Sequence, residues 1–348
     1  MKNKKIFFVA DARSIHTAKW VDYFVEKDYT VYLATFASAN NTKCTNIYYL
    51  GNKESHVSGG NYHYLFGVHK LSEHFRNIQP DTINAHYSYS MGFIALLAKK
   101  FSRITSEFSV VCHGSDVLDP PMPYIFNQIN KYILRRCDKV FAVSDQIKDK
   151  IEKFGLDVEK IFVGQYGIAL SSLAIEKDID IISNRTYTPN SRIDFLLEAI
   201  NEMEYENLNI VFVLPNIEDE EYEDLKNKYP YIVFYKHIEY SKMINLVSRA
   251  KVYISATQSD GTSLSLLEAM QVGCMPLVSN IVSNRSWVLD MVNGYLFDGN
   301  SEFKDKLKII LKLKDPAFII ATNKRLLLEN GNYLRQMKKI EKFLIGNI

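Results

Sequence analysis

Short apolar runs alternate with amphipathic stretches along the first half of the chain. Each run is continuous, which is typical of strands buried on both faces of a parallel sheet. The stretches between the runs carry apolar residues at helical spacing. This alternation predicts a doubly wound α/β sheet. The expected strands are IFFVA (6–10), TVYLAT (30–35), TINA (82–85), FSVVC (108–112) and KVFAVS (139–144).

The same alternation restarts in the second half. We therefore expect an α/β fold of two Rossmann-like, doubly wound domains that face each other across a cleft. They are assigned to residues 1–165 and 166–330, with the join near FVGQYGIALSS (162–172), and residues 331–348 are expected to form a C-terminal helix that returns to the first domain. The strands expected here are IDIIS (179–183), NIVFVL (209–214), IVFYK (232–236), KVYIS (251–255) and MPLVS (275–279).

Length and charge fit this picture. A chain of 348 residues is too long for one ordinary core. The net charge of +2 is uneven: Lys/Arg minus Asp/Glu is 21 − 16 = +5 for residues 1–165, 10 − 19 = −9 for 166–300 and 11 − 5 = +6 for 301–348. The basic parts favour an anionic ligand or membrane surface, although solvated lysines on helices give the same count. No basic run with interleaved aromatic residues suggests nucleic acid.

Cysteines and apolar segments suggest a location. The four cysteines include no C-x-x-C pair, and Cys112 and Cys274, in or beside apolar runs, are typical of core residues in a reducing compartment. The run Ile6–Ala10 is shorter than the apolar core of a signal peptide, and no segment approaches the ~18 apolar residues of a membrane span. We expect a cytoplasmic protein.

Three histidines come shortly after expected strands. Ligands bind at the carboxyl ends of the strands in open parallel sheets, so His16, His86 and His113 are candidates for one site. Each alone is better explained as a structural histidine, but three at equivalent topological positions weaken that explanation. No ligand pair has the spacing of a zinc site. His113 begins the motif HGSD, in which Asp116 either serves a ligand or closes a turn.

The stretch SDGTSLSLLEAMQVGC (259–274) combines a polar loop with the start of a helix. Thr262 or Ser263 is expected to cap a helix that begins at Leu264 and stops at Gly273. The free N–H groups at such a start bind phosphate well. Glu268, one turn along, can accept hydrogen bonds from two ribose hydroxyls, and Asp260 can reach a group beyond the phosphates. The pattern suits a nucleotide sugar, although acids also simply favour a helix start.

The residues SDGTSLSLLEAMQVGCMPLVS (259–279) resemble the donor-site signature of the retaining glycosyltransferases of family 4, which have the two-domain GT-B fold. The resemblance extends over nearly the whole chain, through HTAKWVDYF (16–24), QPDTINAHY (79–87), CHGSD (112–116), RRCDKVFAVSDQIKDKI (135–151), SNRTYTPNSRIDFLLEAI (183–200) and VNGYLF (292–297).

This resemblance implies transfer of a sugar from a nucleoside-diphosphate sugar to an acceptor hydroxyl, with retention and with neither an essential metal nor another cofactor. It implies that Glu268 holds the ribose, that Asp260 holds the donor sugar, and that Arg185 neutralises the leaving phosphate. His113 would contact the sugar near the anomeric centre, and His16, His86 and Asp116 would lie on the acceptor side. The backbone amides implied to hold the diphosphate belong to Gly261, Thr262, Ser263 and Leu264.

The sequence departs from the family pattern in several places. Asp260 stands where Glu is usual, and Ser191 stands where a phosphate-binding lysine is usual, with Arg192 beside it as a possible substitute. The glycine-rich loop after the first strand is replaced by DARSIHT (11–17), and YGIA (166–169) lacks an acid usual in the family. Two alternatives stay open: a degenerate subunit that partners a catalytic glycosyltransferase, and a nucleotide-sugar epimerase.

Family members build bacterial surface polysaccharides and glycolipids, often on lipid-linked acceptors at the inner face of the membrane. The basic first domain would suit a peripheral contact with an anionic membrane, although solvated helix ends explain the same residues. The basic residues in question are Lys99, Lys100, Arg103, Arg135 and Arg136.

Overall fold

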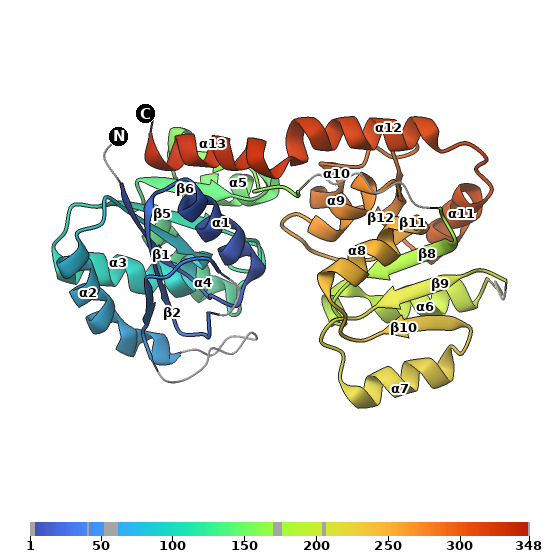
Figure 1. Ribbon diagram of the computed structural model, residues 1–348, viewed down its shortest axis with the longest axis horizontal. Helices are drawn as coiled ribbons and strands as arrows, with labels where there is room; N and C mark the ends of the chain where they lie inside the picture. The colour runs from blue at the N-terminus through green and yellow to red at the C-terminus, as the bar shows by residue number, and fades with distance from the viewer. Residues whose placement is uncertain (1–3, 40–41, 52–61, 170–175, 204–206, 347–348) are drawn as a thin grey trace. The chain divides into compact units, whose positions relative to one another are not determined.

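The computed structural model describes residues 4–39, 42–51, 62–169, 176–203 and 207–346 (Figure 1). The chain divides into two compact units, one formed by Met1–Tyr166 with Leu334–Ile348 and the other by Gly167–Tyr333. The division falls between Tyr166 and Gly167, and residues 170–172 of the expected join lie outside the described residues. Each unit holds one parallel sheet with its helices, as the alternating pattern predicts.

The first unit is built on a seven-stranded parallel sheet of order β3-β2-β1-β4-β5-β6-β7. All five expected strands are present. Two additional strands, β3 and β7, are three residues long and were not predicted. The strands are β1 (Lys5–Val9), β2 (Thr30–Thr35), β3 (Ile47–Tyr49), β4 (Thr82–His86), β5 (Glu107–Cys112), β6 (Lys139–Ala142) and β7 (Ile161–Val163).

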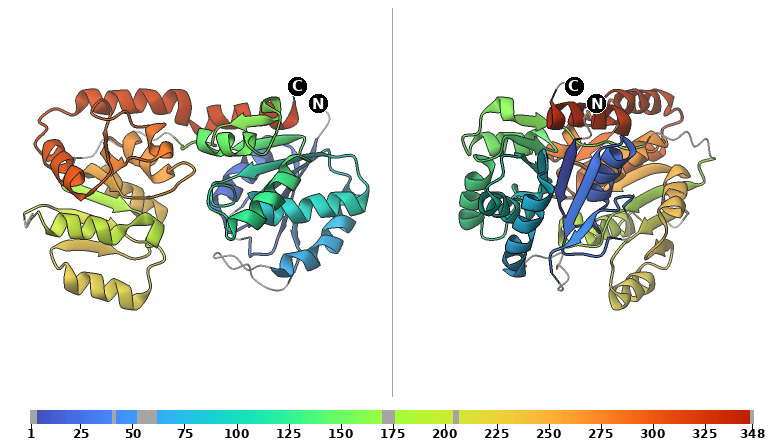
Figure 2. Two further views of the ribbon diagram at one scale, coloured as in Figure 1. Left: turned by 180° about the vertical axis from the view of Figure 1, so that it is seen from behind. Right: turned by 60° about the vertical axis from the view of Figure 1, so that its left-hand side comes forward.

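Helices cover both faces of this sheet because its central strands are apolar on both sides (Figure 2). Consecutive residues of β1 show the alternation: Phe7 meets Phe75 of α2 edge to face at 5.0 Å between ring centroids, and Phe8 meets Phe24 of α1 at 5.8 Å. The helices are α1 (Ile15–Glu26), α2 (Gly67–Ile78), α3 (Phe93–Ser102), α4 (Pro123–Leu134) and α5 (Asp145–Glu152).

The C-terminal helix α13 (Tyr333–Ile345) packs on the first unit, as expected. Lys4 donates from Nζ to the carbonyl of Ile345, 341 residues away, at 2.8 Å. Glu341 accepts hydrogen bonds from the hydroxyls of Tyr23 and Tyr29 at 2.7 and 2.8 Å. These contacts and the apolar face of α13 hold the helix against the first unit.

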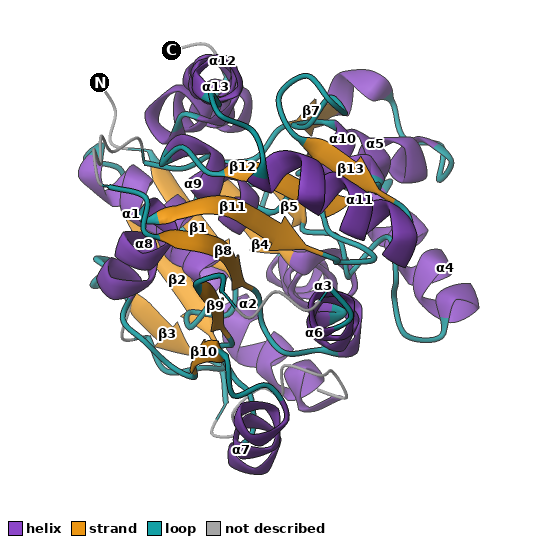
Figure 3. Ribbon diagram, turned by 90° about the vertical axis from the view of Figure 1, so that its right-hand side faces the viewer, coloured by secondary structure: helices purple, strands orange, loops and turns teal. Residues whose placement is uncertain are grey.

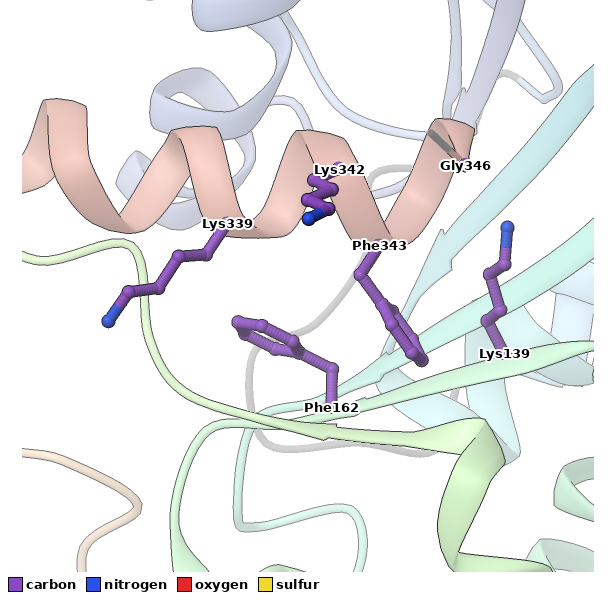
Figure 4. A pocket seen from close by; sticks show the side chains of 6 residues that line it. All are labelled: Lys139, Phe162, Lys339, Lys342, Phe343 and Gly346. Carbon is purple, nitrogen blue, oxygen red and sulfur yellow. The ribbon is translucent and has the colours of Figure 1, made fainter. Parts of the chain in front are cut away.

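Beneath α13, the ring of Phe343 lies 5.5 Å from that of Phe162 on β7 (Figure 4). A hollow of about 460 Å³ opens beside the two rings. It contains none of the residues that the sequence assigns to a site. Its lining consists of Lys139, Phe162, Lys339, Lys342, Phe343 and Gly346.

The second unit is built on a six-stranded parallel sheet of order β10-β9-β8-β11-β12-β13, and Figure 3 shows its first four strands side by side. The five expected strands are present, and VNGYLF (292–297), for which no strand was expected, contributes the short strand β13. The strands are β8 (Ile179–Asn184), β9 (Ile210–Val213), β10 (Ile232–Tyr235), β11 (Ala250–Ser255), β12 (Met275–Ser279) and β13 (Tyr295–Phe297).

Two apolar clusters, one of them including α6 and α11 and the other including α8 and α9, bury this second sheet. Within the described ranges, no helix of either unit has the length and apolar character needed to cross a bilayer. The helices of the second unit are α6 (Ile193–Asn201), α7 (Asp219–Lys228), α8 (Tyr240–Ser248), α9 (Leu264–Gln271), α10 (Val282–Arg285), α11 (Asn300–Leu311) and α12 (Ala317–Leu326).

Candidate functional site

The strand order of the second unit reverses between β8 and β11, which are hydrogen-bonded neighbours. From β8 the chain builds outward through β9 and β10, and from β11 it builds the other way through β12 and β13. Such a switch point leaves a crevice at the carboxyl ends of the two strands, where ligands of doubly wound sheets bind. Arg185 directly follows β8, and the loop that carries Asp260 follows β11.

Arg185 forms hydrogen bonds with side chains of the loop after β11 and of the start of α9. Its Nη2 donates to Oδ2 of Asp260 at 2.9 Å. Its Nη1 donates to the hydroxyls of Ser263 at 3.0 Å and Ser265 at 3.2 Å. Burial opposes the charge of Arg185, but Asp260 beside it holds the pKa of the guanidinium above its usual value. The crevice therefore contains a fixed positive charge.

Helix α9 begins at Leu264, as predicted, and Ser263 is its cap. The Ser263 hydroxyl accepts from the backbone N–H of Leu266 at 3.3 Å, whereas Thr262 donates to the carbonyl of Gly261. Gly273, with φ +84°, follows the helix end in the left-handed region. The structure thus brings Arg185 to the N-terminal end of a helix, where amides and dipole also favour an anion.

Tyr253 and Asn190 support this loop and were not identified from the sequence. The hydroxyl of Tyr253, a buried residue of β11, lies 2.9 Å from that of Ser265. Asn190 donates from Nδ2 to the carbonyl of Ser259 at 2.9 Å and accepts from its N–H at 3.0 Å. The sequence shows a tyrosine inside the expected strand KVYIS, but it does not reveal which way the ring points.

Glu268 lies one turn inside α9 and is half-buried. Its Oε1 accepts from the hydroxyl of Tyr240, the first residue of α8, at 2.8 Å. Burial and the adjacent carboxylate raise the pKa of Tyr240. The tyrosine therefore keeps its proton at neutral pH and orients the carboxylate.

Arg192 does not join Arg185. Its guanidinium lies over the ring of Phe195, 4.3 Å from the centroid, and its backbone is left-handed with φ +51°. Ser191, where the family lysine is usual, is buried, and its hydroxyl lies 3.0 Å from that of Thr188. Neither residue supplies a second cation to the Arg185 cluster in this structure.

The three candidate histidines, His16, His86 and His113, meet in the first unit at the corresponding switch point, between β1 and β4. His86 ends β4, His113 follows β5, and His16 is the second residue of the helix after β1. Nε2 of His113 lies 3.2 Å from Nδ1 of His86, and the ring centroids of His16 and His113 are 5.2 Å apart. The hydroxyl of Tyr166, which the sequence did not single out, lies 3.0 Å from Nδ1 of His16.

Burial keeps two of these histidines neutral. It lowers the pKa of His86 to about 3, with a further contribution from His16. Burial, then His86 and His16, also holds the pKa of His113 well below its usual value. At neutral pH these rings act as hydrogen-bonding groups without charge. No group of three His, Cys, Asp or Glu residues in the described part of the chain is arranged to hold a metal ion.

Asp116 closes the turn after His113. Its Oδ1 accepts from the backbone N–H groups of His113 and Gly114, both at 3.0 Å, and its Oδ2 accepts from that of Ser88 at 2.8 Å. The carboxylate is 1% exposed, and burial raises its pKa. Gly114 has φ +127°, a conformation that side chains disfavour. Any effect of Asp116 on a ligand must therefore pass through the turn that it holds.

Family models match both units. Residues 5–144 match the model of the glycosyl transferase 4-like proteins, and residues 170–337 match that of the glycosyl transferases group 1. The chain thus belongs to the glycosyltransferases that these two models describe. No curated protein matches the sequence significantly.

Solved structures show the same fold. HepE from Anabaena in complex with UDP has a TM-score of 0.79 at 13% identity, over 99% of this chain and 100% of that one. A glycosyltransferase from Rickettsia africae has a TM-score of 0.79 at 15% identity, over the whole of both chains. Sucrose-phosphate synthase from Thermosynechococcus elongatus has a TM-score of 0.80 at 13% identity, over 97% of this chain and 98% of that one. These likenesses confirm the predicted GT-B fold.

Proposed function

We propose that this glycosyltransferase moves a sugar from a nucleoside-diphosphate sugar to an acceptor hydroxyl with retention of configuration and without an essential metal. The observation that carries the proposal is the position of Arg185, which Asp260 and Ser263 hold at the N-terminus of α9. A cation largely shielded from water beside the N-terminal amides of a helix matches the charge of a diphosphate.

The donor would lie along the start of α9. The amides of Gly261 to Leu264 and the guanidinium of Arg185 would bind the diphosphate. Glu268, held by Tyr240, would accept from the ribose hydroxyls. HepE has been crystallised with UDP and with UDP-glucose, which supports a donor of this class here.

Asp260 would contact the donor sugar. Only its Oδ2 is engaged by Arg185, and its Oδ1 accepts no hydrogen bond from any residue in the described ranges. That oxygen can accept from a sugar hydroxyl without breaking the ion pair. The shorter side chain, compared with the usual Glu, is thus anchored by the same arginine that would bind the phosphate.

Catalysis would depend on stabilising the negative charge that develops on the leaving diphosphate. Arg185 and the helix amides are fixed before the reaction, so they need little reorganisation when that charge appears. The leaving phosphate would itself deprotonate the acceptor on the same face of the sugar, and no protein nucleophile is invoked. His113, being neutral, would donate a hydrogen bond near the anomeric centre.

The acceptor would be a carbohydrate or lipid-linked molecule of bacterial surface polysaccharide or glycolipid synthesis, used by a cytoplasmic protein in peripheral contact with the inner face of the membrane. The structure leaves part of the basic set available for such a contact: Lys100 and Arg103 at the end of α3 are exposed. Nζ of Lys99 instead lies 3.7 Å from Oδ2 of Asp138. Arg135 donates from Nε to the carbonyl of Phe154.

A second candidate, a degenerate subunit that assists a catalytic partner, is favoured by one observation. Ser191 and Arg192 provide no second cation to the cluster around Arg185. Hydrolysis of nucleotide sugars separates the two candidates. An enzyme should release the diphosphate slowly from its donor and lose this activity in Arg185→Ala, whereas a partner subunit should turn over no member of a broad donor and acceptor panel.

A further inference from the structure

We infer that His86 is a positioning residue: its Nδ1–H donates to Nε2 of His113 and so fixes the tautomer in which His113 carries its proton on Nδ1. The pairing follows from the structure alone, and its meaning for catalysis rests on the proposed function. The family resemblance implies that His86 lies on the acceptor side but gives it no role in fixing the tautomer of His113.

The two rings are held close together. Nε2 of His113 lies 3.2 Å from Nδ1 of His86, a distance that allows one hydrogen bond. His86 is 0% exposed at the end of β4, and aromatic rings surround it. Trp20 meets it edge to face at 5.3 Å, and Phe8 does so at 6.2 Å.

One of the two nitrogens must carry the shared proton, because two bare lone pairs or two N–H groups would repel each other. If His86 donates, its other nitrogen, Nε2, is a bare acceptor. If His113 donates, Nε2 of His86 carries an N–H. That atom is buried and has no hydrogen-bond partner among the described residues.

Among buried backbone groups, N–H donors without a partner are rarer than under-satisfied acceptors. We apply the same preference to the ring nitrogens and therefore favour the first arrangement. The rings of Trp20 and Phe8 are neighbours of the His86 ring, and an N–H directed at an aromatic ring is a weaker interaction than a conventional hydrogen bond. A doubly protonated His86 is disfavoured as well, since burial lowers its pKa to about 3.

His113 is thus held from two sides. Asp116 fixes its backbone N–H at 3.0 Å, and His86 fixes the far side of its ring. The ring centroid of Tyr87 lies 4.6 Å from that of His113, at an interplanar angle of 32°. The remaining nitrogen, Nδ1, then presents a hydrogen to an oxygen atom of the substrate. In this state His113 donates a hydrogen bond and cannot act as a base toward the acceptor hydroxyl.

Two substitutions of His86 distinguish this role from simple packing. His86→Asn places an amide N–H close to the position of Nδ1, so it preserves the donor. His86→Phe keeps a ring of similar size and removes the donor. We expect His86→Asn to keep donor hydrolysis within about threefold of wild type, and His86→Phe to lower kcat by about 10- to 100-fold with little change in KM, as when an orienting partner of a histidine is removed. His69→Asn, at an 80% exposed histidine on α2, is the matched control.

The direct test is ¹⁵N NMR of the histidine side chains in the full chain, with signals assigned by their loss in His86→Asn and His113→Asn. Protonated Nδ1 in both His86 and His113, with a changed tautomer of His113 in His86→Phe, would support the inference. Protonated Nε2 in His113 would overturn it, as would an unchanged tautomer and rate in His86→Phe. If His86→Phe does not fold, the wild-type spectrum decides alone. The predicted tautomers with no turnover of any nucleotide sugar would refute the proposed function and leave the inference standing.

Discussion

Nη2 of Arg185 donates to Oδ2 of Asp260 at 2.9 Å, and this pair joins the carboxyl ends of the two central strands of the second sheet. The two side chains are 17% and 20% exposed, so the contact is largely shielded from water. The acid both anchors the arginine and reduces the net positive charge that a diphosphate would meet. The arginine and the acid should therefore affect binding and turnover differently.

Removing the arginine should abolish charge stabilisation of the leaving group. We expect Arg185→Ala to lower kcat for donor hydrolysis by about 100- to 1,000-fold, the loss typical for one preorganised donor at a developing anion. Arg185→Lys should recover only part of this rate because a lysine lacks the planar fork. Arg249→Ala, which removes an exposed arginine paired with Asp178, is the control and should retain activity. Equal rates in Arg185→Ala and wild type would contradict the account.

Neutralising the acid should separate binding from catalysis. Asp260→Asn keeps an oxygen that can accept from Arg185 but leaves the guanidinium charge uncompensated. We expect the diphosphate product to bind as tightly as to wild type or more tightly, while kcat falls because the sugar loses a charged acceptor. Calorimetry and steady-state kinetics measure the two effects separately. Weaker diphosphate binding together with unchanged kcat would show that Asp260 does not act on the sugar.

The buried histidines should make stability depend on pH. His86 has a pKa of about 3 in the folded protein, lowered from 6.5 chiefly by burial. Below pH 6.5 the unfolded chain takes up a proton that the folded chain does not, so the free energy of unfolding falls as the pH falls. The loss approaches about 1.4 kcal/mol per pH unit for each such histidine.

Urea unfolding between pH 7 and pH 4.5 measures this dependence. His86→Phe should lose stability less steeply than wild type as the pH decreases, since one of the groups that gains a proton on unfolding is absent. His69→Phe, on the exposed face of α2, should leave the slope unchanged. Parallel slopes for wild type and His86→Phe would contradict the burial of a neutral His86.

We expect membrane binding to depend on the end of α3. Phe101 is 61% exposed there and lies between the exposed residues Lys100 and Arg103. An apolar ring flanked by cations suits the interface of an anionic bilayer. Vesicles rich in anionic lipid should sediment the wild type at low salt and release it at high salt.

The double substitution Lys100→Glu/Arg103→Glu should abolish this sedimentation, and Phe101→Ser should weaken it. Lys226→Glu/Lys228→Glu makes the same change of charge on α7 of the second unit and should leave sedimentation unchanged. Binding that is insensitive to salt, or equally reduced by both double substitutions, would refute a specific contact through α3.

Continuous apolar runs such as IFFVA and KVYIS made the strands predictable, because a buried parallel strand requires them. The strands IYY (47–49) and YLF (295–297) escaped prediction since three residues carry too little pattern. Tyr87, with φ +70°, begins a π-helical turn that no residue preference indicated. Local chemistry allowed either Thr262 or Ser263 as the cap of α9, and only the structure decides for Ser263.

The site was predictable as a set of residues but not as a set of contacts. The strand-end rule identified His16, His86 and His113 without knowledge of the sheet order. The Arg185–Asp260 pair connects residues 75 positions apart and depends on β8 lying beside β11. Sequence reasoning assigned one of them to the phosphate and the other to the sugar, and it had no means of showing that they bind each other.

The most direct test of the donor site is calorimetric titration of UDP, GDP, ADP, CMP and dTDP into wild type and into folded Glu268→Ala. The account predicts that one nucleotide binds the wild type and that the substitution weakens it by about 10-fold or more, as loss of hydrogen bonds to a charged acceptor would. Tyr240→Phe, which removes one hydrogen bond to Glu268, should weaken nucleotide binding less. Equal binding to wild type and Glu268→Ala, or no binding of any nucleotide to wild type, would contradict the proposed donor site.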